Sequence, residues 1–482
     1  MPPRSRDTSH ARPAVTLAVL SLAALAYAVL SSAVIPALPT IRASLHASET
    51  GVTWLLTGFL LSASIGTAII GKLGDMYSKQ RLLVWTLLIL TAGTVLAGLS
   101  VSLPLLIAAR VIQGVAGGIF PLSFSIARDE FPAERVAGSI GLISAILGVG
   151  GGFGLVLGGL IGEHLSWHWL FWIPLAAMVL AAACAWRFIP ESSLRSPGRV
   201  NWTAAVLMTA GMSGLLLGIA QTSVWGWTGP ATLALLAGGL ALSAAWIGVE
   251  LRSANPLIDM TMMRVRGVWT VNLAAFLVGG GLYAWFLLLP QFAQLPVSTG
   301  FGYGASVVVA GLYLLPCAIG MGVLGSVAGR VERRFSSRTA LIAGAAMSAV
   351  ACGWLTFSSK HPYDMLITST VLGIGIGLAF AALGNLIVQA VPAHQTGAAS
   401  GMNTVLRTLG GALGGQIAAT FVVSSTVGGL PRLSGFTATF AMAAVFLAGC
   451  ALAGLLIPGR LLLPVQARQT PPGQPAVTTD IT

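Results

Sequence analysis

Charged side chains are scarce in this sequence: Asp, Glu, Lys and Arg make up 8% of its 482 residues, and only 13 residues are acidic. A soluble domain carries about 25% charged residues, so an ordinary water-facing surface is excluded. Hydrophobic residues account for 56% of the chain. The composition therefore predicts an integral membrane protein. Its net charge of +12 is then assigned to loops at the membrane surface and not to a nucleic-acid partner.

Cysteine is also rare, and the cysteines lie inside apolar stretches without the spacing of a metal or redox site. They are Cys184, Cys317, Cys352 and Cys450. We find neither a cluster of metal-ligand residues nor a nucleophile paired with a base in the sequence. We therefore expect no metal, no cofactor and no enzymatic activity.

Fourteen apolar stretches are long enough to cross a bilayer as helices, which takes about 20 residues each. They cover residues 14–37, 50–71, 80–99, 103–127, 137–162, 167–188, 201–221, 229–249, 267–291, 304–329, 338–358, 363–389, 397–423 and 433–457. An even number places both termini on one side, and most of the 25 Lys and Arg residues fall on that side. Positive residues mark the cytoplasmic face. We therefore expect a multi-pass protein of the inner or plasma membrane with both termini in the cytoplasm.

An internal repeat divides the chain into two related parts. Phe131–Gly138 leads into one glycine-rich span, and the similar stretch Val391–Gly397 leads into another. Two six-helix repeats of this kind are typical of membrane transporters. The predicted organisation is a cytoplasmic N-terminus at 1–13, a six-helix bundle at 14–188, a linker with two inserted helices at 189–266, a second six-helix bundle at 267–457, and a disordered cytoplasmic tail at 458–482.

A short hydrophilic loop joins the second and third spans and reads Gly71-Lys72-Leu73-Gly74-Asp75, followed by basic residues up to Arg81. It resembles the signature loop of major facilitator superfamily transporters. Glycines let two helix ends approach closely, and the aspartate can accept hydrogen bonds or pair with arginine across the junction. The resemblance implies that Gly71, Gly74, Asp75 and Arg81 latch the cytoplasmic side.

Arg110 lies within the fourth span, three residues before Gln113. This stretch resembles the fourth-helix motif of drug:proton antiporters of the same superfamily, in which the arginine is linked to proton translocation. A guanidinium at this depth costs at least about 2.5 to 3.5 kcal/mol unless it is hydrated or paired, so we expect it to face a cavity. The alternative is an arginine held by backbone carbonyls for structure alone.

The fifth span carries Gly150, Gly154 and Gly158, which resemble the glycine-rich motif of the antiporters. Glycines at these intervals allow close helix contact, and the resemblance suggests a hinge or gate between the halves. Leu155 stands where the family usually has proline, so we expect no proline kink.

The first span lacks the membrane-embedded carboxylate that many relatives carry, because Leu30 occupies that position. None of the 13 acidic residues falls near the middle of a predicted span. Proton coupling normally needs a titratable group whose pKa responds to burial and to substrate. Asp75 and Arg110 on the inner side and Glu163 on the outer side remain the candidates.

Polar and aromatic residues inside the spans outline a possible substrate cavity. They are Tyr27, Ser31, Gln113, Asn272, Phe276, Tyr283, Tyr313, Asn385, Asn403 and Arg407. Ordinary hydrogen bonds between packed helices are the alternative for each of them taken singly. Arg407 is the exception, because an unpaired arginine in the membrane is costly. It could attract an anionic group or pair with a distant carboxylate.

The sequence as a whole predicts an all-α polytopic membrane protein with the major facilitator fold: 14 transmembrane helices, as two six-helix bundles plus two extra helices. It resembles the drug:proton antiporter branch over nearly its whole length. That resemblance implies a monomeric secondary transporter that exports hydrophobic or amphipathic small molecules by proton antiport and alternating access, among membrane lipids. The alternatives are a lipid or specific-metabolite exporter without strict proton coupling and, from another class, a membrane enzyme or sensor.

Overall fold

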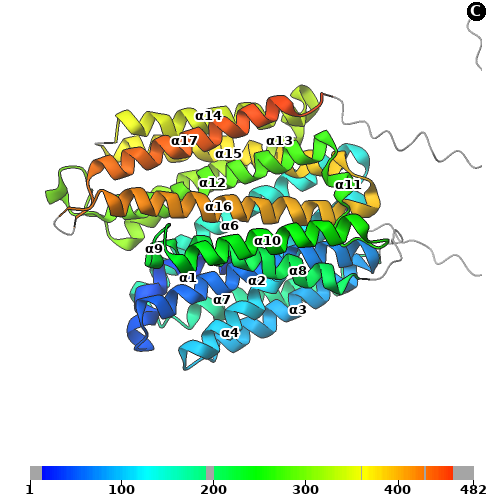
Figure 1. Ribbon diagram of the computed structural model, residues 1–482, viewed down its shortest axis with the longest axis horizontal. Helices are drawn as coiled ribbons and strands as arrows, with labels where there is room; N and C mark the ends of the chain where they lie inside the picture. Colours follow the sequence, from blue (N-terminus) through cyan, green and yellow to red (C-terminus); the bar gives the residue numbers. More distant parts are fainter. Residues whose placement is uncertain (1–12, 192–199, 360, 428–429, 460–482) are drawn as a thin grey trace, which may run out of the picture.

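The computed structural model describes residues 13–191, 200–359, 361–427 and 430–459, and Figure 1 shows long helices that run side by side. Regular structure in these ranges is helical, apart from an isolated bridge between Val427 and Leu430. The predicted segments 1–13 and 458–482 lie almost entirely outside the described residues. The predicted all-α fold class is confirmed.

Each half of the chain supplies six long segments, and the linker between them supplies two more. The first half comprises α1 (Pro13–Ser44), α2 (Glu49–Met76), α3 (Lys79–Gly98), α4 (Leu103–Gly114) with η1 (Val115–Gly118) and α5 (Ile119–Glu130), α6 (Ala133–His164) and α7 (Trp169–Phe188). The linker comprises α8 (Trp202–Ala220), α9 (Thr222–Trp225), α10 (Pro230–Arg252) and α11 (Met260–Met263). The second half comprises α12 (Arg266–Gln294), η2 (Val297–Thr299), α13 (Val307–Phe335), α14 (Ser337–Phe357), α15 (Pro362–Ala390), η3 (Ala393–Gln395), α16 (Thr396–Ser424) and α17 (Leu433–Leu456).

Within the described ranges, 13 helical segments are long and apolar enough to span a membrane. The fourteenth predicted span corresponds to α16, which has 29 residues but carries Arg407, Gln416 and several threonines. Residues 396–420 are all buried or half-buried, because α16 packs against α2, α5, α8, α12 and α17. Since protein and not lipid surrounds α16, it can carry polar side chains that a lipid-facing helix could not.

The two halves meet along a seam formed by two helix pairs. Helix α2 packs along α16, and α6 packs along α13. The linker helices α8 and α10 pack on each other, and α8 also lies against α2 and α16. Figure 1 shows this pair running along the boundary between the halves. The extra helices therefore cover one side of the seam.

The glycines of α6 divide into two sets that face different partners. A Cβ atom added at Gly154 would lie 2.5 Å from the Val29 carbonyl oxygen, and one at Gly158 would lie 2.0 Å from the Ala33 carbonyl oxygen, both on α1. Across the seam, an added Cβ at Gly152 would lie 2.4 Å from Ala318 of α13. Helix α6 is thus held against α1 by one glycine row, while other small residues form the contact with α13.

The glycines of α6 that face α1 lead to a prediction about stability. Replacing Gly158 with alanine would force α1 and α6 apart, and overpacking of this kind costs about 1–3 kcal/mol. We therefore expect Gly158→Ala to lower the melting temperature and the monodisperse yield of the purified protein in detergent. Gly151→Ala is the matched control, because an added Cβ there meets no atom within 4 Å. Equal stability of the two variants would contradict the packing described for α1 and α6.

Candidate transport site: an inner latch and a central pair of arginines

Asp75 joins the two halves at the end where the basic loops lie. It sits in the last turn of α2 and is 1% exposed. Its carboxylate accepts hydrogen bonds from the backbone N–H groups of Gly397 and Ala398, both at 2.9 Å. These groups belong to the first turn of α16, where unpaired N–H donors and the helix dipole favour a negative charge. The aspartate of one half therefore caps a helix of the other.

Glycine makes this approach possible. A Cβ atom added at Gly397 would lie 2.1 Å from the Gly71 carbonyl oxygen, and one at Gly71 would lie 2.4 Å from the Gly397 carbonyl oxygen. A larger side chain at either position would push α2 and α16 apart and lengthen the hydrogen bonds to Asp75. In contrast, Arg81 lies away from this contact and pairs with Glu191 at 2.6 Å, where both side chains are exposed.

Further contacts close the same end of the seam. Arg128 donates from Nη1 to the Val391 carbonyl at 3.0 Å and to Thr396 Oγ1 at 2.8 Å. Asn385 of α15 donates to the Ala137 carbonyl of α6 at 3.0 Å. We refer to the contacts of Asp75, Arg128 and Asn385 with the opposite half as the inner latch.

The latch includes one buried carboxylate that sequence reasoning did not single out. Glu332 is 7% exposed and accepts hydrogen bonds from Asn385 and Ser337. Asn385, predicted to line the substrate cavity, thus uses its amide on Glu332 and on Ala137 at the latch. Glu332 and Arg128 gave no signal in the sequence beyond their place at the ends of spans.

Arg110 lies at the centre of the first half and is fully buried. Its Nε donates to the Leu55 carbonyl at 3.2 Å, and its Nη1 donates to the Leu30 carbonyl at 3.3 Å and to Gln113 Oε1 at 2.9 Å. Its guanidinium carbon lies 4.1 Å from the centre of the Phe59 ring. Among the described residues, Nη2 has no hydrogen-bond partner. Arg110 is thus held by two backbone carbonyls, as expected for an arginine with a structural role alone, but one of its donor groups is unused.

The contact with Leu30 explains what the missing carboxylate of the first span means. Leu30 is the position at which the sequence comparison expected aspartate, and it touches Arg110 through its carbonyl oxygen. Because the chain has leucine, a neutral carbonyl takes the place of a counter-ion, and the charge of Arg110 is solvated but not neutralised.

Arg407 occupies the corresponding place in the second half. It is half-buried on α16, and its guanidinium carbon lies 4.8 Å from the centre of the Phe380 ring. A Cβ added at Gly279 of α12 would lie 3.1 Å from Arg407 Cγ, and one added at Gly411 of α16 would lie 2.7 Å from the Tyr283 ring, so Tyr283 of α12 lies beside Arg407. Tyr283 also lies near Tyr27 of α1. Tyr283 is 40% exposed although it lies in the middle of its helix. Its exposed surface therefore faces the space between the halves.

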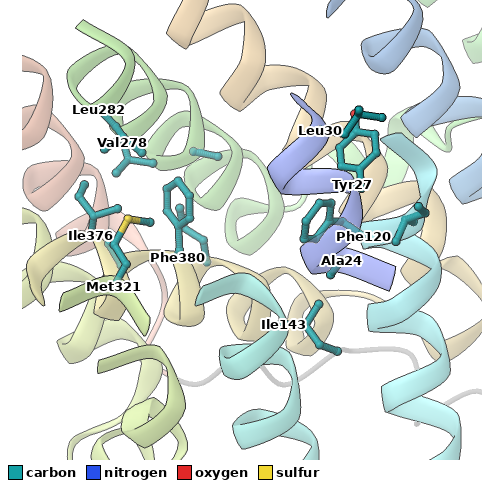
Figure 2. Packing of buried hydrophobic residues seen from close by; sticks show 14 of the residues in the cluster. Ala24, Tyr27, Leu30, Phe120, Ile143, Val278, Leu282, Met321, Ile376 and Phe380 are labelled. Carbon is teal, nitrogen blue, oxygen red and sulfur yellow. The ribbon is translucent and has the colours of Figure 1, made fainter. Parts of the chain in front are cut away.

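Aromatic rings flank this central region on both sides. Tyr27 stacks on Phe59 with ring centres 5.7 Å apart and meets Phe120 edge-on at 6.0 Å. Figure 2 shows Tyr27 and Phe120 in the first half and Phe380 in the second half. Tyr27, Arg110, Tyr283 and Arg407, all predicted from the sequence, thus lie around this central region, and their role in a substrate site stays a prediction.

The other residues predicted for the cavity lie around this site or away from it. Gln113 connects Arg110 to Thr94, and Asn403 donates to Asn272 at 3.0 Å, which ties α16 to α12. Phe276 packs with the apolar residues between α2, α8 and α16. The Ser31 hydroxyl donates to its own helix, at the Ala28 carbonyl. Tyr313 lies near Tyr303, with ring centres 5.8 Å apart.

The three residues predicted for proton coupling lie at different depths. Phe59, which stacks on Arg110, precedes Asp75 by 16 positions on α2, so the two levels are about 24 Å apart at 1.5 Å per residue. Glu163 is exposed near the far end of α6, nine residues beyond Gly154, which packs on Val29. Asp75, Arg110 and Glu163 therefore do not form one hydrogen-bonded relay. In the described part of the chain, no group of three or more His, Cys, Asp and Glu side chains could hold a metal ion.

The family model of the Major Facilitator Superfamily matches residues 20–415, and the chain belongs to this family. The chain is 33% identical to the cephamycin export protein CmcT of Amycolatopsis lactamdurans, over 97% of this chain and 96% of that protein. It is 28% identical to multidrug resistance protein 3 of Bacillus subtilis, over 86% of this chain and 81% of that one. The tetracenomycin C resistance and export protein of Streptomyces glaucescens is also 28% identical, over 86% and 76% of the two chains.

Among solved structures, the fold is similar to that of the human organic anion transporter MFSD10. The TM-score is 0.66, and the match covers 93% of this chain and all of the other at 16% sequence identity. Such a low identity compares the folds alone. The predicted major facilitator fold, with two six-helix bundles and two extra helices, is confirmed.

The inner latch generates a prediction about accessibility. Asp75→Ala removes the cap of α16, and each lost hydrogen bond to a charged group is worth about 1.5–3 kcal/mol. We expect the inner end of the seam to open more often, so that a cysteine placed at the buried position Ala398 reacts at least several-fold faster with a membrane-impermeant maleimide. The four native cysteines set the background rate, which is measured without the Ala398→Cys change.

Glu191→Gln is the control for this experiment. It removes one carboxylate from the same end of the protein, but from an exposed ion pair with Arg81 that contributes about 0–1 kcal/mol. We expect its labelling rate to equal that of the unmodified protein. If Asp75→Ala and Glu191→Gln label at the same rate, Asp75 does not hold the latch closed.

Proposed function

We propose that the protein exports hydrophobic or amphipathic small molecules across the cytoplasmic membrane by alternating access. One observation carries the proposal: the inner ends of the halves are joined by buried hydrogen bonds, while Tyr283 and Arg407 keep exposed surface between the halves at mid-depth. A central site that is sealed at one end and keeps exposed surface between the halves corresponds to the outward-facing stage of an exporter's transport cycle. The relatives named for export support the same direction.

The charge distribution supports the proposed orientation. The latch end carries Lys72, Lys79, Arg81, Arg128 and Arg330. Positive residues accumulate on the cytoplasmic side of membrane proteins. The latch then faces the cytoplasm, both termini lie there, and the closed end is the one through which a drug would enter. The protein would act as a monomer among membrane lipids.

We propose proton antiport as the energy source, with Asp75 as its principal titratable group. Asp75 is buried, and its two described hydrogen bonds come from backbone N–H groups of the opposite half. Protonation would remove the charge that the α16 terminus stabilises, so it would weaken the latch and favour opening to the cytoplasm. Arg110 and Glu163 lie too far from Asp75 to share its proton directly.

The lipid-exporter alternative requires an apolar opening between the halves toward the bilayer. The structure has an apolar groove of about 450 Å³ lined by residues such as Leu312, Pro316 and Ile319 of α13 and Ile374 of α15. Both helices belong to the second half, so this groove lies on one bundle and not between the two. Its position does not favour lipid export over export of soluble amphipathic molecules.

Transport by the purified protein tests the proposal. In proteoliposomes with an imposed pH gradient, we expect a fluorescent amphipathic dye to move against a counterflow of protons. Asp75→Asn and Arg110→Ala should each reduce the rate at least tenfold, because the first weakens the latch and the second removes the buried charge of the central site. Glu163→Gln should change the rate less than twofold, because Glu163 is exposed and distant from both.

Size-exclusion profiles of each variant establish that it is folded. Dye movement that ignores the pH gradient would remove proton antiport from the proposal and leave a facilitator. Full activity of both Asp75→Asn and Arg110→Ala, in protein of native elution volume, would exclude the latch and the central arginine from the transport mechanism.

A further inference from the structure

The two central arginines lie at the same depth on opposite sides of the seam. Helices α2 and α16 run antiparallel there, since Gly71 meets Gly397 and Thr67 meets Gly401. Continuing this register places Arg407 level with position 61 of α2, two residues from Phe59, or about 3 Å along the axis. Phe59 stacks on Arg110. Both guanidinium groups are therefore at one level of the protein, about 24 Å from Asp75.

Neither arginine is neutralised by a carboxylate in the described part of the chain. The ion pairs described there are Lys79 with Asp129 and Arg81 with Glu191, and both lie at the latch end. Arg110 is fully buried with Nη2 unpartnered. Arg407 lies over the Phe380 ring and packs on Gly279 of α12, one helical turn from Tyr283. Two uncompensated cations thus face one interior region, which is costly unless something anionic visits it.

The surroundings of these cations suit an amphipathic guest. Tyr27 of the first half lies near Arg110, Tyr283 of the second half lies near Arg407, and each hydroxyl can donate a hydrogen bond. Phe59, Phe120 and Tyr27 form an aromatic cluster on one side, and Phe380 supplies a ring on the other. Donors at the centre with aromatic walls match a ligand that has a carboxylate and a flat apolar body.

We infer that the central site selects organic anions, and that the ligand's carboxylate is bound between Arg407 and Arg110 while its apolar body packs on the flanking rings. The inference rests on the proposed function and names the substrate class of that exporter. Arg407 is the accessible contact, because it is half-buried and uncommitted. Arg110 offers its unpartnered Nη2, and its hydrogen bonds to the Leu30 and Leu55 carbonyls hold the guanidinium in a fixed orientation.

A purely structural role does not account for both arginines. Such a role would use the guanidinium donors on backbone or side-chain acceptors, as three of the contacts of Arg110 do. The described hydrogen bonds include none from Arg407. A cationic substrate is disfavoured by the same geometry, because both fixed charges would repel it in a region of low dielectric.

A matched pair of ligands tests the inference. N-dansyl-phenylalanine is a fluorescent amphipathic carboxylate, and its methyl ester has the same body without the charge. We expect the full-length protein in detergent or liposomes to bind the acid at least tenfold more tightly than the ester. Arg407→Gln should abolish this preference by weakening acid binding at least tenfold, with ester binding within twofold. Arg407→Lys should restore part of the preference, since it restores the charge without the planar fork.

Arg432→Gln is the control for net charge. It removes one cation from the same half of the protein, at the exposed N-cap position just before α17. Its preference for the acid should equal that of the unmodified chain. Retained ester binding shows that each variant still forms the site.

The outcomes separate this inference from the proposed function. Equal binding of acid and ester, or an unchanged preference in Arg407→Gln, overturns the anion site, and the exporter proposal stands if the protein still moves a neutral or cationic dye along a pH gradient. Failure to bind either dansyl compound combined with failure to move any dye overturns both.

Discussion

The free-energy cost of holding a charge away from water governs the arrangement of this protein. Three buried charges have specific partners: Asp75 accepts hydrogen bonds from two backbone N–H groups of the opposite half, Lys79 pairs with Asp129, and Arg110 donates to two backbone carbonyls. Contacts of this kind satisfy a charge only in one arrangement of the helices. The closed inner end is therefore fixed by electrostatics, while the helix contacts around it are apolar and adaptable.

Small residues make those electrostatic contacts reachable. Asp75 can cap α16 only because Gly71 and Gly397 let the two backbones meet. In the second half, Asn385 donates hydrogen bonds to the Ala137 carbonyl of α6 and to the buried carboxylate of Glu332, and a Cβ added at Gly329 would lie 2.6 Å from Gly138. One interface thus places a carboxylate directly on the backbone of the opposite half, whereas the other reaches the opposite half through a neutral amide and close packing.

The sequence was sufficient to predict the fold and the positions of the spans, because hydropathy is a local signal, whereas the assignment of Tyr27, Arg110, Tyr283 and Arg407 to a substrate site stays a prediction. It was not sufficient to predict the contacts that close the latch. Arg128 binds Val391 and Thr396, more than 260 residues away, and no local pattern encodes such a partner. Asn385 gave the same polar signal as a cavity residue, yet its partner Glu332 places it at the latch. The polarity of α16 is likewise a consequence of its enclosure by other helices.

The inner latch and the central site are linked by the two helices that they share. Direct electrostatic coupling between Asp75 and the arginines is weak, since two charges about 24 Å apart interact by about 0.7 kcal/mol at an effective dielectric constant of 20. However, α2 carries both Asp75 and Phe59, and α16 carries both the capped terminus and Arg407. Any movement that releases the cap must therefore shift Phe59 relative to Arg407. Under the proposed proton antiport, substrate and proton would influence one another through the relative position of these two helices, without a carboxylate in the middle of the membrane.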